Sequence, residues 1–325
     1  MEIGGYLELE NFRLPMRHDG SVALNCGRNC LAYLIEKKNI KKIYIPKFLC
    51  ASVGDICKKC GAEVIYYSIG MDFLPLFSFE LVNGAWLYVV NYYGQISNAQ
   101  LMKIKQRYQN VIVDNVQAYF QDPCKGVDTI YSCRKFFGVS DGAFLYSDIE
   151  GDEALEIDCS FERMAHILGR YEKTASEFFP KYKRVEKEFE DMPIKRMSKL
   201  TDNILRGLDY CSIERTRTEN FRFLHDKLAA ENLLDIEVPP GPYMYPLYVK
   251  NGYKIRKKLQ EAKIFVATLW PDALELCSDD ELEYDMAKNI LPLPVDQRYG
   301  ISEMEILAME TLKNIRKGDM SYSVE

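Results

Sequence analysis

The sequence lacks long apolar runs and has few histidines. Its longest apolar stretches, such as residues 85–90, have the length of a strand and are too short to cross a bilayer. The first residues carry no basic region followed by an apolar one, so we expect no signal peptide. Only three histidines occur in 325 residues, which argues against a zinc site built from histidine and cysteine.

The ten cysteines are too dilute in a chain of this length to form a disulfide framework. We therefore expect reduced thiols in a cytoplasmic protein. Cys57 and Cys60 have CxxC spacing, but they fall late in a predicted helix, whereas redox motifs begin a helix. We interpret them as ordinary helix residues, with metal or redox use as the alternative.

The charge balance is mildly acidic, with 42 basic and 48 acidic residues and a formal net charge of -6. A chain of this charge has no general electrostatic attraction to nucleic acid. We therefore expect neither a nucleic-acid nor a membrane partner, and small-molecule ligands instead.

Short apolar segments alternate with helical ones in the first half of the chain. This alternation predicts an α/β fold with a mostly parallel central sheet covered by helices. The predicted strands are 42–45, 63–67, 85–91, 111–114, 129–132 and 142–147, and the predicted helices are 28–38, 51–59 and 98–108.

The second half has a different character. Residues 161–231 are charge-rich and predicted to be helical, with breaks at Pro180 and Pro193. After a proline-rich loop at 239–242, a smaller α+β unit is expected. Its predicted elements are a strand at 243–249, a helix at 253–262, a strand at 264–269 and a helix at 302–316. We predict a large domain at 1–205 and a small C-terminal domain at 206–325.

Two segments combine a predicted element end with a group suited to ligand binding. Gly27 opens a helix, where backbone N–H groups and the helix dipole favour an anion, although many such turns only cap the helix. Asp114 ends a predicted strand, and Gln117 follows it. Ligands of open α/β sheets bind at those strand ends, although an aspartate there is also typical of a helix cap.

Lys135 follows the end of another predicted strand and precedes two phenylalanines. A lysine in this setting either extends over the aromatic rings to reach water or forms a Schiff base with a carbonyl compound. Ser132, three residues earlier, has a hydroxyl suited to phosphate. Residues 140–146 predict a turn that leads the lysine loop back into the sheet.

In their order and spacing, these segments resemble the DegT/DnrJ/EryC1/StrS sugar aminotransferases, which depend on pyridoxal 5'-phosphate (PLP) and have fold type I. The sequence departs from the family pattern at Cys26 and Arg28, where members have Ser and Thr, and at Asn91, where members often have His. The chain is also shorter than typical members. The resembling segments are 26–28, 45–46, 61–62, 90–94, 114–117, 132–135, 141–143, 291–294 and 301–305.

The resemblance implies a role for each site residue. Lys135 would form the Schiff base and shuttle a proton, and Asp114 would pair with the pyridine nitrogen. Gln117 and Asn91 would lie near the ring hydroxyl. The remaining implied cofactor contacts are the phosphate contacts of Ser132, Gly27 and Arg28, and coverage of the ring face by Cys50, where members often have an aromatic residue.

The resemblance also implies a reaction. An amino group would pass from an amino acid, expected to be glutamate, to a keto-sugar, expected to be nucleotide-linked. The context would be lipopolysaccharide or other polysaccharide synthesis, or secondary metabolism, and the enzyme would be a homodimer. Some relatives have His in place of the lysine and act as dehydratases, and Lys135 argues against that branch.

Three alternatives stay open at this point. The first is a PLP-dependent lyase or desulfurase of the same fold. The second is a non-catalytic binding module, which would be expected to lose Lys135 or Asp114. The third is a nicotinamide dehydrogenase, which is disfavoured because no GxGxxG follows a first strand.

Overall fold

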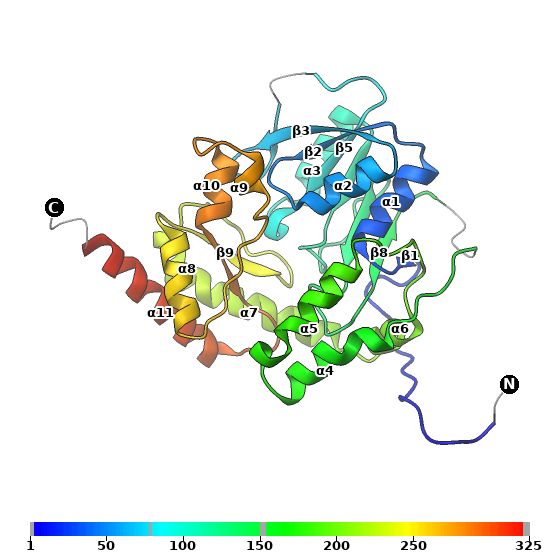
Figure 1. Ribbon diagram of the computed structural model, residues 1–325. Coiled ribbons are helices and arrows are strands. Elements are labelled where there is room, and N and C mark those ends of the chain that lie inside the picture. The colour runs from blue at the N-terminus through cyan, green and yellow to red at the C-terminus, as the bar shows by residue number, and fades with distance from the viewer. Residues whose placement is uncertain (1–2, 78–79, 150–153, 321–325) are drawn as a thin grey trace.

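The computed structural model describes residues 3–77, 80–149 and 154–320. These residues form an eight-stranded sheet in the order β1-β8-β7-β6-β5-β2-β3-β4 (Figure 1). Strands β7, β6, β5, β2 and β3 run parallel, whereas β1, β8 and β4 are antiparallel to their neighbours. The strands are β1 (Val22–Leu24), β2 (Lys42–Pro46), β3 (Glu63–Ile69), β4 (Pro75–Leu76), β5 (Trp86–Val90), β6 (Val111–Asp114), β7 (Asp128–Ser132) and β8 (Ala143–Tyr146).

The inner strands are apolar because helices cover the sheet. Val111, Ile112 and Val113 of β6 are completely buried, as expected of a parallel strand with both faces covered. Helix α1 (Gly27–Lys37) packs on β7 and β8, α2 (Ala51–Lys59) packs on β3, and α3 (Asn98–Tyr108) packs on β6. The predicted fold class, a mostly parallel sheet covered by helices, is confirmed.

The second half of the chain is mainly helical. In Figure 1, α7, α8, α10 and α11 gather around β9 on one side of the molecule, and β9 pairs with β10 as an antiparallel ribbon. The elements are η2 (Phe161–Met164), α4 (Ala165–Glu172), α5 (Ala175–Glu188), α6 (Lys199–Leu205), α7 (Tyr210–Leu228), η3 (Ala229–Glu231), β9 (Met244–Tyr248), α8 (Gly252–Glu261), α9 (Ala273–Leu276), α10 (Leu282–Asn289), β10 (Ile290–Pro294) and α11 (Ile301–Met320), with η1 (Tyr92–Gly94) earlier in the chain.

No helix in the described part of the chain has both the length and the apolar character needed to cross a bilayer. The predicted domain boundary at residue 205 falls at the end of α6, between α6 and α7. The division into two domains stays a prediction.

The predicted break at Pro180 is wrong. Pro180 lies inside α5, which continues to Glu188. A proline removes one backbone hydrogen bond, here to the carbonyl four residues earlier, at Ser176. Both Pro180 and Ser176 are exposed, so water can satisfy that carbonyl. The break predicted at Pro193 is confirmed, because Pro193 lies in the non-helical segment between α5 and α6.

The predicted strand at 264–269 is also wrong. That segment is irregular, and the place beside β9 is taken by β10, whose Pro292 lies opposite Pro246. Prolines are tolerated there because a two-stranded ribbon has outer edges that need no ladder hydrogen bonds. The short strand β1 and helices α9 and α10 were not predicted.

Candidate active site

Asp114 ends β6 at the carboxyl edge of the parallel strands. Its side chain is 3% exposed. Oδ2 accepts a 2.6 Å hydrogen bond from the Tyr88 hydroxyl, and Oδ1 accepts a 2.9 Å bond from the Val116 N–H. No cation lies within ion-pair distance of Asp114 among the described residues. This carboxylate is therefore buried with hydrogen bonds but without a paired positive charge.

The burial of Asp114 changes the pKa of its carboxyl group. Desolvation raises the pKa of Asp114 above its ordinary value, and the positive charge of Lys135 and the two hydrogen bonds oppose the rise. A buried carboxylate without an ion-pair partner costs stability unless a cationic group joins it. The arrangement thus suits a ligand that presents a protonated nitrogen to Asp114.

Lys135 lies in the loop that joins β7 to β8. Its side chain is exposed, whereas the following Phe136 and Phe137 are buried. Its Nζ lies 5.8 Å from the ring centre of Tyr243. Lys135 is close enough to Asp114 to act on its pKa. The loop therefore keeps its aromatic residues in the core and its amine at the surface of the site.

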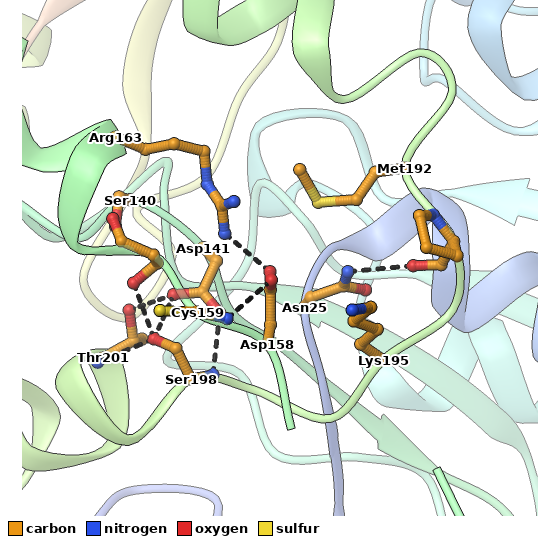
Figure 2. A network of polar contacts seen from close by, with 12 residues as sticks. Asn25, Ser140, Asp141, Asp158, Cys159, Arg163, Met192, Lys195, Ser198 and Thr201 are labelled. Atoms are coloured by element: carbon orange, nitrogen blue, oxygen red, sulfur yellow. Dashed lines mark hydrogen bonds and ion pairs between the residues drawn. The ribbon is translucent and has the colours of Figure 1, made fainter. Parts of the chain in front are cut away.

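The turn that carries Lys135 is anchored from behind by Asp141, which is completely buried. Figure 2 shows this network. Asp141 accepts hydrogen bonds from the Ser198 N–H and hydroxyl, both at 2.8 Å, and from the Thr201 hydroxyl. Gly142 has a φ of +106° and its N–H donates to the Asn25 carbonyl at 2.7 Å. The lysine loop is thereby fixed to the start of α6 and to the segment before α1.

The start of α1 offers an anion site. Its N-cap, Cys26, makes no side-chain capping bond. Burial raises the pKa of the Cys26 thiol, while Arg28 and Arg134 are close enough to lower it. A Cβ placed on Gly27 would lie 3.5 Å from Val116, so this turn packs against the segment that follows Asp114. A helix start beside two arginines favours a phosphate group.

Residues 185–195 cover this turn from the outside. Val185, Phe189 and the partly buried Met192 pack around Cys26. The side chains of Asn25 and Asn29 both donate to the Pro193 carbonyl, at 3.0 and 2.8 Å. Figure 2 draws the bond from Asn25 as a dashed line. The sequence predicted only a helix break at Pro193, so this cover was missed.

A second set of contacts connects that cover to the lysine loop. The Arg134 guanidinium lies 3.9 Å from the ring centre of Phe189 and pairs with Glu186 of α5. Arg134 directly precedes Lys135 in the chain. The cover, the anion site and the lysine are therefore held together as one unit.

The other predicted site residues occupy different settings. Gln117 is 1% exposed, and its Oε1 accepts from the Tyr93 N–H at 2.9 Å. Asn91 is completely buried, donates to Asn115 and Gln121, and accepts from the Ile96 N–H. Its amide thus holds the loop after Asp114. The predicted contacts of Gln117 and Asn91 with a cofactor ring stay predictions.

Cys50 and Ser132 both lie at the end of an element. Cys50 is the N-cap of α2, is partly exposed, and lies close enough to Tyr88 to raise the pKa of that hydroxyl, behind the larger effects of burial and Asp114. Ser132 ends β7 and is 9% exposed. Their predicted roles, over the ring face and at the phosphate, also stay predictions.

The charge on Asp114 should cost the apoprotein stability. At pH values above the ordinary aspartate pKa the unfolded chain has already lost this proton, while the folded chain, with its raised pKa, still holds it. Stability therefore falls as pH rises through that window. We expect Asp114→Asn to raise the melting temperature of the apoprotein at pH 7 and to lose this advantage near pH 4. Melting temperatures that are equal for the wild type and Asp114→Asn at both pH values would contradict this expectation.

Comparison with known proteins gives matches at the level of structure. No protein-family model matches the chain, and no curated protein sequence matches it. NtdA from Bacillus subtilis, solved with the bound cofactor PMP, superposes with a TM-score of 0.65 at 14% identity over 91% of this chain and 73% of its own.

Two further solved structures agree with this result. A DegT DnrJ EryC1 StrS aminotransferase from Brucella abortus gives a TM-score of 0.59 at 12% identity, over 90% of this chain and 85% of its own. The sugar aminotransferase CalS13 from Micromonospora echinospora gives a TM-score of 0.58 at 14% identity, over 90% and 86% of the two chains. This chain therefore has the fold of the DegT/DnrJ/EryC1/StrS-type aminotransferases, as its sequence resemblance predicted.

Proposed function

We propose that the protein is a PLP-dependent aminotransferase that transfers an amino group from an amino acid to a keto-sugar. The observation that carries this proposal is a buried carboxylate, Asp114, that has no ion-pair partner among the described residues, together with an exposed lysine, Lys135, that is close enough to lower its pKa. The fold supports it, because solved proteins of this fold include sugar aminotransferases and one with bound PMP.

The residues present fit the three polar parts of PLP. The pyridine nitrogen, when protonated, supplies the cation that the buried Asp114 lacks. The start of α1, with Arg28 and Arg134, suits the phosphate, and the resemblance adds Ser132 to this group. Lys135 supplies an amine for the aldehyde. When bound, PLP provides an electron sink that stabilises negative charge at the carbon bearing the amine.

The chain's own groups would act as follows. The Nζ of Lys135 would hold the cofactor until the amino donor replaces it. The freed amine would then move a proton from the donor's α-carbon to the cofactor carbon that bears the amino group. Each oxygen of Asp114 accepts one protein hydrogen bond and keeps lone pairs for a further donor. Asp114 would thereby hold a proton on the ring nitrogen of bound PLP.

The finer assignments rest on the sequence resemblance. They are glutamate as the donor, a nucleotide-linked keto-sugar as the acceptor, a role in polysaccharide or secondary-metabolite synthesis, a homodimer and a cytoplasmic location. A screen of amino donors would follow once cofactor binding has been measured.

Covalent attachment of PLP is the direct test. We expect the purified protein to develop a visible absorption band with PLP, and borohydride to fix the cofactor to the peptide that contains Lys135. Peptide mass spectrometry identifies the site, and Lys135→Ala should give neither the band nor the modified peptide. Attachment spread over surface lysines, or no attachment to the wild type, would overturn the proposed function.

A further inference from the structure

Tyr88 is a buried residue of β5 whose hydroxyl contacts the candidate site. Its side chain is 3% exposed, and its hydroxyl donates to Asp114 Oδ2 at 2.6 Å. Tyr88 lies outside the segments that resemble the sugar aminotransferases. Its hydroxyl provides one of the two hydrogen bonds that the Asp114 carboxylate accepts from the described residues.

The sheet explains how the two groups meet. Strands β5 and β6 are parallel, with Tyr88 opposite Ile112 and Val90 opposite Asp114. Side chains two residues apart point to the same face of a strand. Tyr88 and Asp114 therefore share one face, and the length of the tyrosine side chain covers the two-residue offset between them.

The two hydrogen bonds fix the plane of the carboxylate. The Val116 N–H holds Oδ1 from the chain that follows, and the Tyr88 hydroxyl holds Oδ2 from the neighbouring strand. A carboxylate with one donor on each oxygen cannot rotate without losing a bond in a buried setting. Hydrogen bonds to an ionised acceptor are also stronger than neutral ones.

We propose that Tyr88 is a positioning residue that orients the Asp114 carboxylate towards the ring nitrogen of the cofactor. This inference rests on the proposed function. Tyr88 acts through Asp114. The hydrogen bond also lowers the pKa of Asp114 against the larger effect of burial, so it favours the charged form that a ring nitrogen requires.

Most titratable groups near Asp114 stay neutral over the pH range in which its titration would be measured. The side chains of Lys135, Tyr92 and Cys30 of α1 are close enough to Asp114 to interact with its charge. Burial raises the pKa of Cys30 and of Tyr92 well above their ordinary values, so both stay neutral between pH 4 and 8. Near Tyr88, the thiols that act on its pKa are those of Cys50, which precedes α2, and of Cys57 in α2, and burial raises the pKa of Cys57 to about 12.

The experiment compares the wild type with Tyr88→Phe by NMR in two states. In the apoprotein, the ¹³Cγ signal of Asp114, assigned with Asp114→Asn, should titrate at higher pH in Tyr88→Phe because one stabilising bond to the charged form is lost. In the protein loaded with ¹⁵N-labelled PLP, the ring nitrogen should lose its proton at lower pH. We expect kcat to fall about tenfold with KM unchanged.

Tyr67→Phe is the matched control. Tyr67 is also buried, and its hydroxyl donates at 2.7 Å to the backbone carbonyl of Tyr88 rather than to Asp114. This variant also loses the hydrogen bond of a buried tyrosine. Because the lost bond does not involve Asp114, the variant should leave both titrations unchanged. Replacing Tyr88 with 3,5-difluorotyrosine, a stronger donor of nearly the same shape, should move the Asp114 titration in the opposite direction.

Measurements on the apoprotein and on the PLP-loaded protein distinguish failure of the Tyr88 inference from failure of the proposed function. If the wild type binds PLP at Lys135 but Tyr88→Phe titrates like Tyr67→Phe in both states, the role of Tyr88 is overturned and the proposed function stands. If PLP does not attach to the wild type, the proposed function fails, and with it the positioning role, whatever the apoprotein titration shows.

Discussion

Turnover of an amino donor is expected to fall by about 10²- to 10⁴-fold when Lys135 is replaced by alanine. The variant loses the amine that takes and returns the proton, and general acid–base groups contribute factors of this size. Cofactor bound without a covalent link can still meet substrate, so some activity should remain. Single-turnover kinetics with a large excess of PLP measure the loss.

Small amines sharpen this prediction. Methylamine added to Lys135→Ala should restore part of the rate, because it replaces the missing proton carrier, and it should not affect the wild type. Lys125→Ala is the control: Lys125 is an exposed lysine in the loop between β6 and β7 and should keep full activity. A Lys135→Ala enzyme with more than a tenth of the wild-type rate would contradict the assignment.

The largest effect on stability is expected at Asp141. Replacement by alanine removes the acceptor for the Ser198 N–H and the Thr201 hydroxyl, both completely or almost completely buried. Because each buried donor left without a partner carries its full desolvation cost, we expect Asp141→Ala to lower the free energy of unfolding by about 3–5 kcal/mol. Urea titration measures the change.

A graded series tests the cause of this loss. Asp141→Asn keeps the shape and one acceptor oxygen, so it should be less destabilising than Asp141→Ala. Asp202, one residue after Thr201, pairs with Arg206 at the surface, and Asp202→Ala should change stability by less than about 1 kcal/mol. If Asp141→Ala and Asp202→Ala had similar effects, the buried network would not be the anchor inferred for the lysine loop.

Local sequence patterns account for most of the sheet. Helix α3 begins with a capping box between Ser97 and Gln100, and β6 is a short apolar run that ends in aspartate, so both were predicted at their observed bounds. The segment 264–269 has strand-like composition, but which segment pairs with β9 depends on the packing of the whole C-terminal part. That choice cannot be read from a local pattern.

Some residues of the candidate site could be predicted from the sequence, and others could not. Asp114 ends an apolar strand and Lys135 follows one, so the sequence pattern singled out both, and the family resemblance supplied their predicted roles. Tyr88 was missed because its partner is 26 residues away, and within a strand it has the appearance of any core aromatic. Asp141 was predicted only as part of a turn, because its role as an acceptor depends on Ser198, which lies 57 residues later.

The cover over α1 has a consequence for synthesis of the chain. Every strand of the eight-stranded sheet lies before residue 147. The side-chain amide of Asn25, however, donates to the Pro193 carbonyl, and the Asn25 N–H donates to the Lys195 carbonyl. Chains emerge from the ribosome N-terminus first. A nascent chain can therefore pair its whole sheet while the turn before α1 still exposes unpaired amides to water, and that turn is completed only when residues 192–195 emerge.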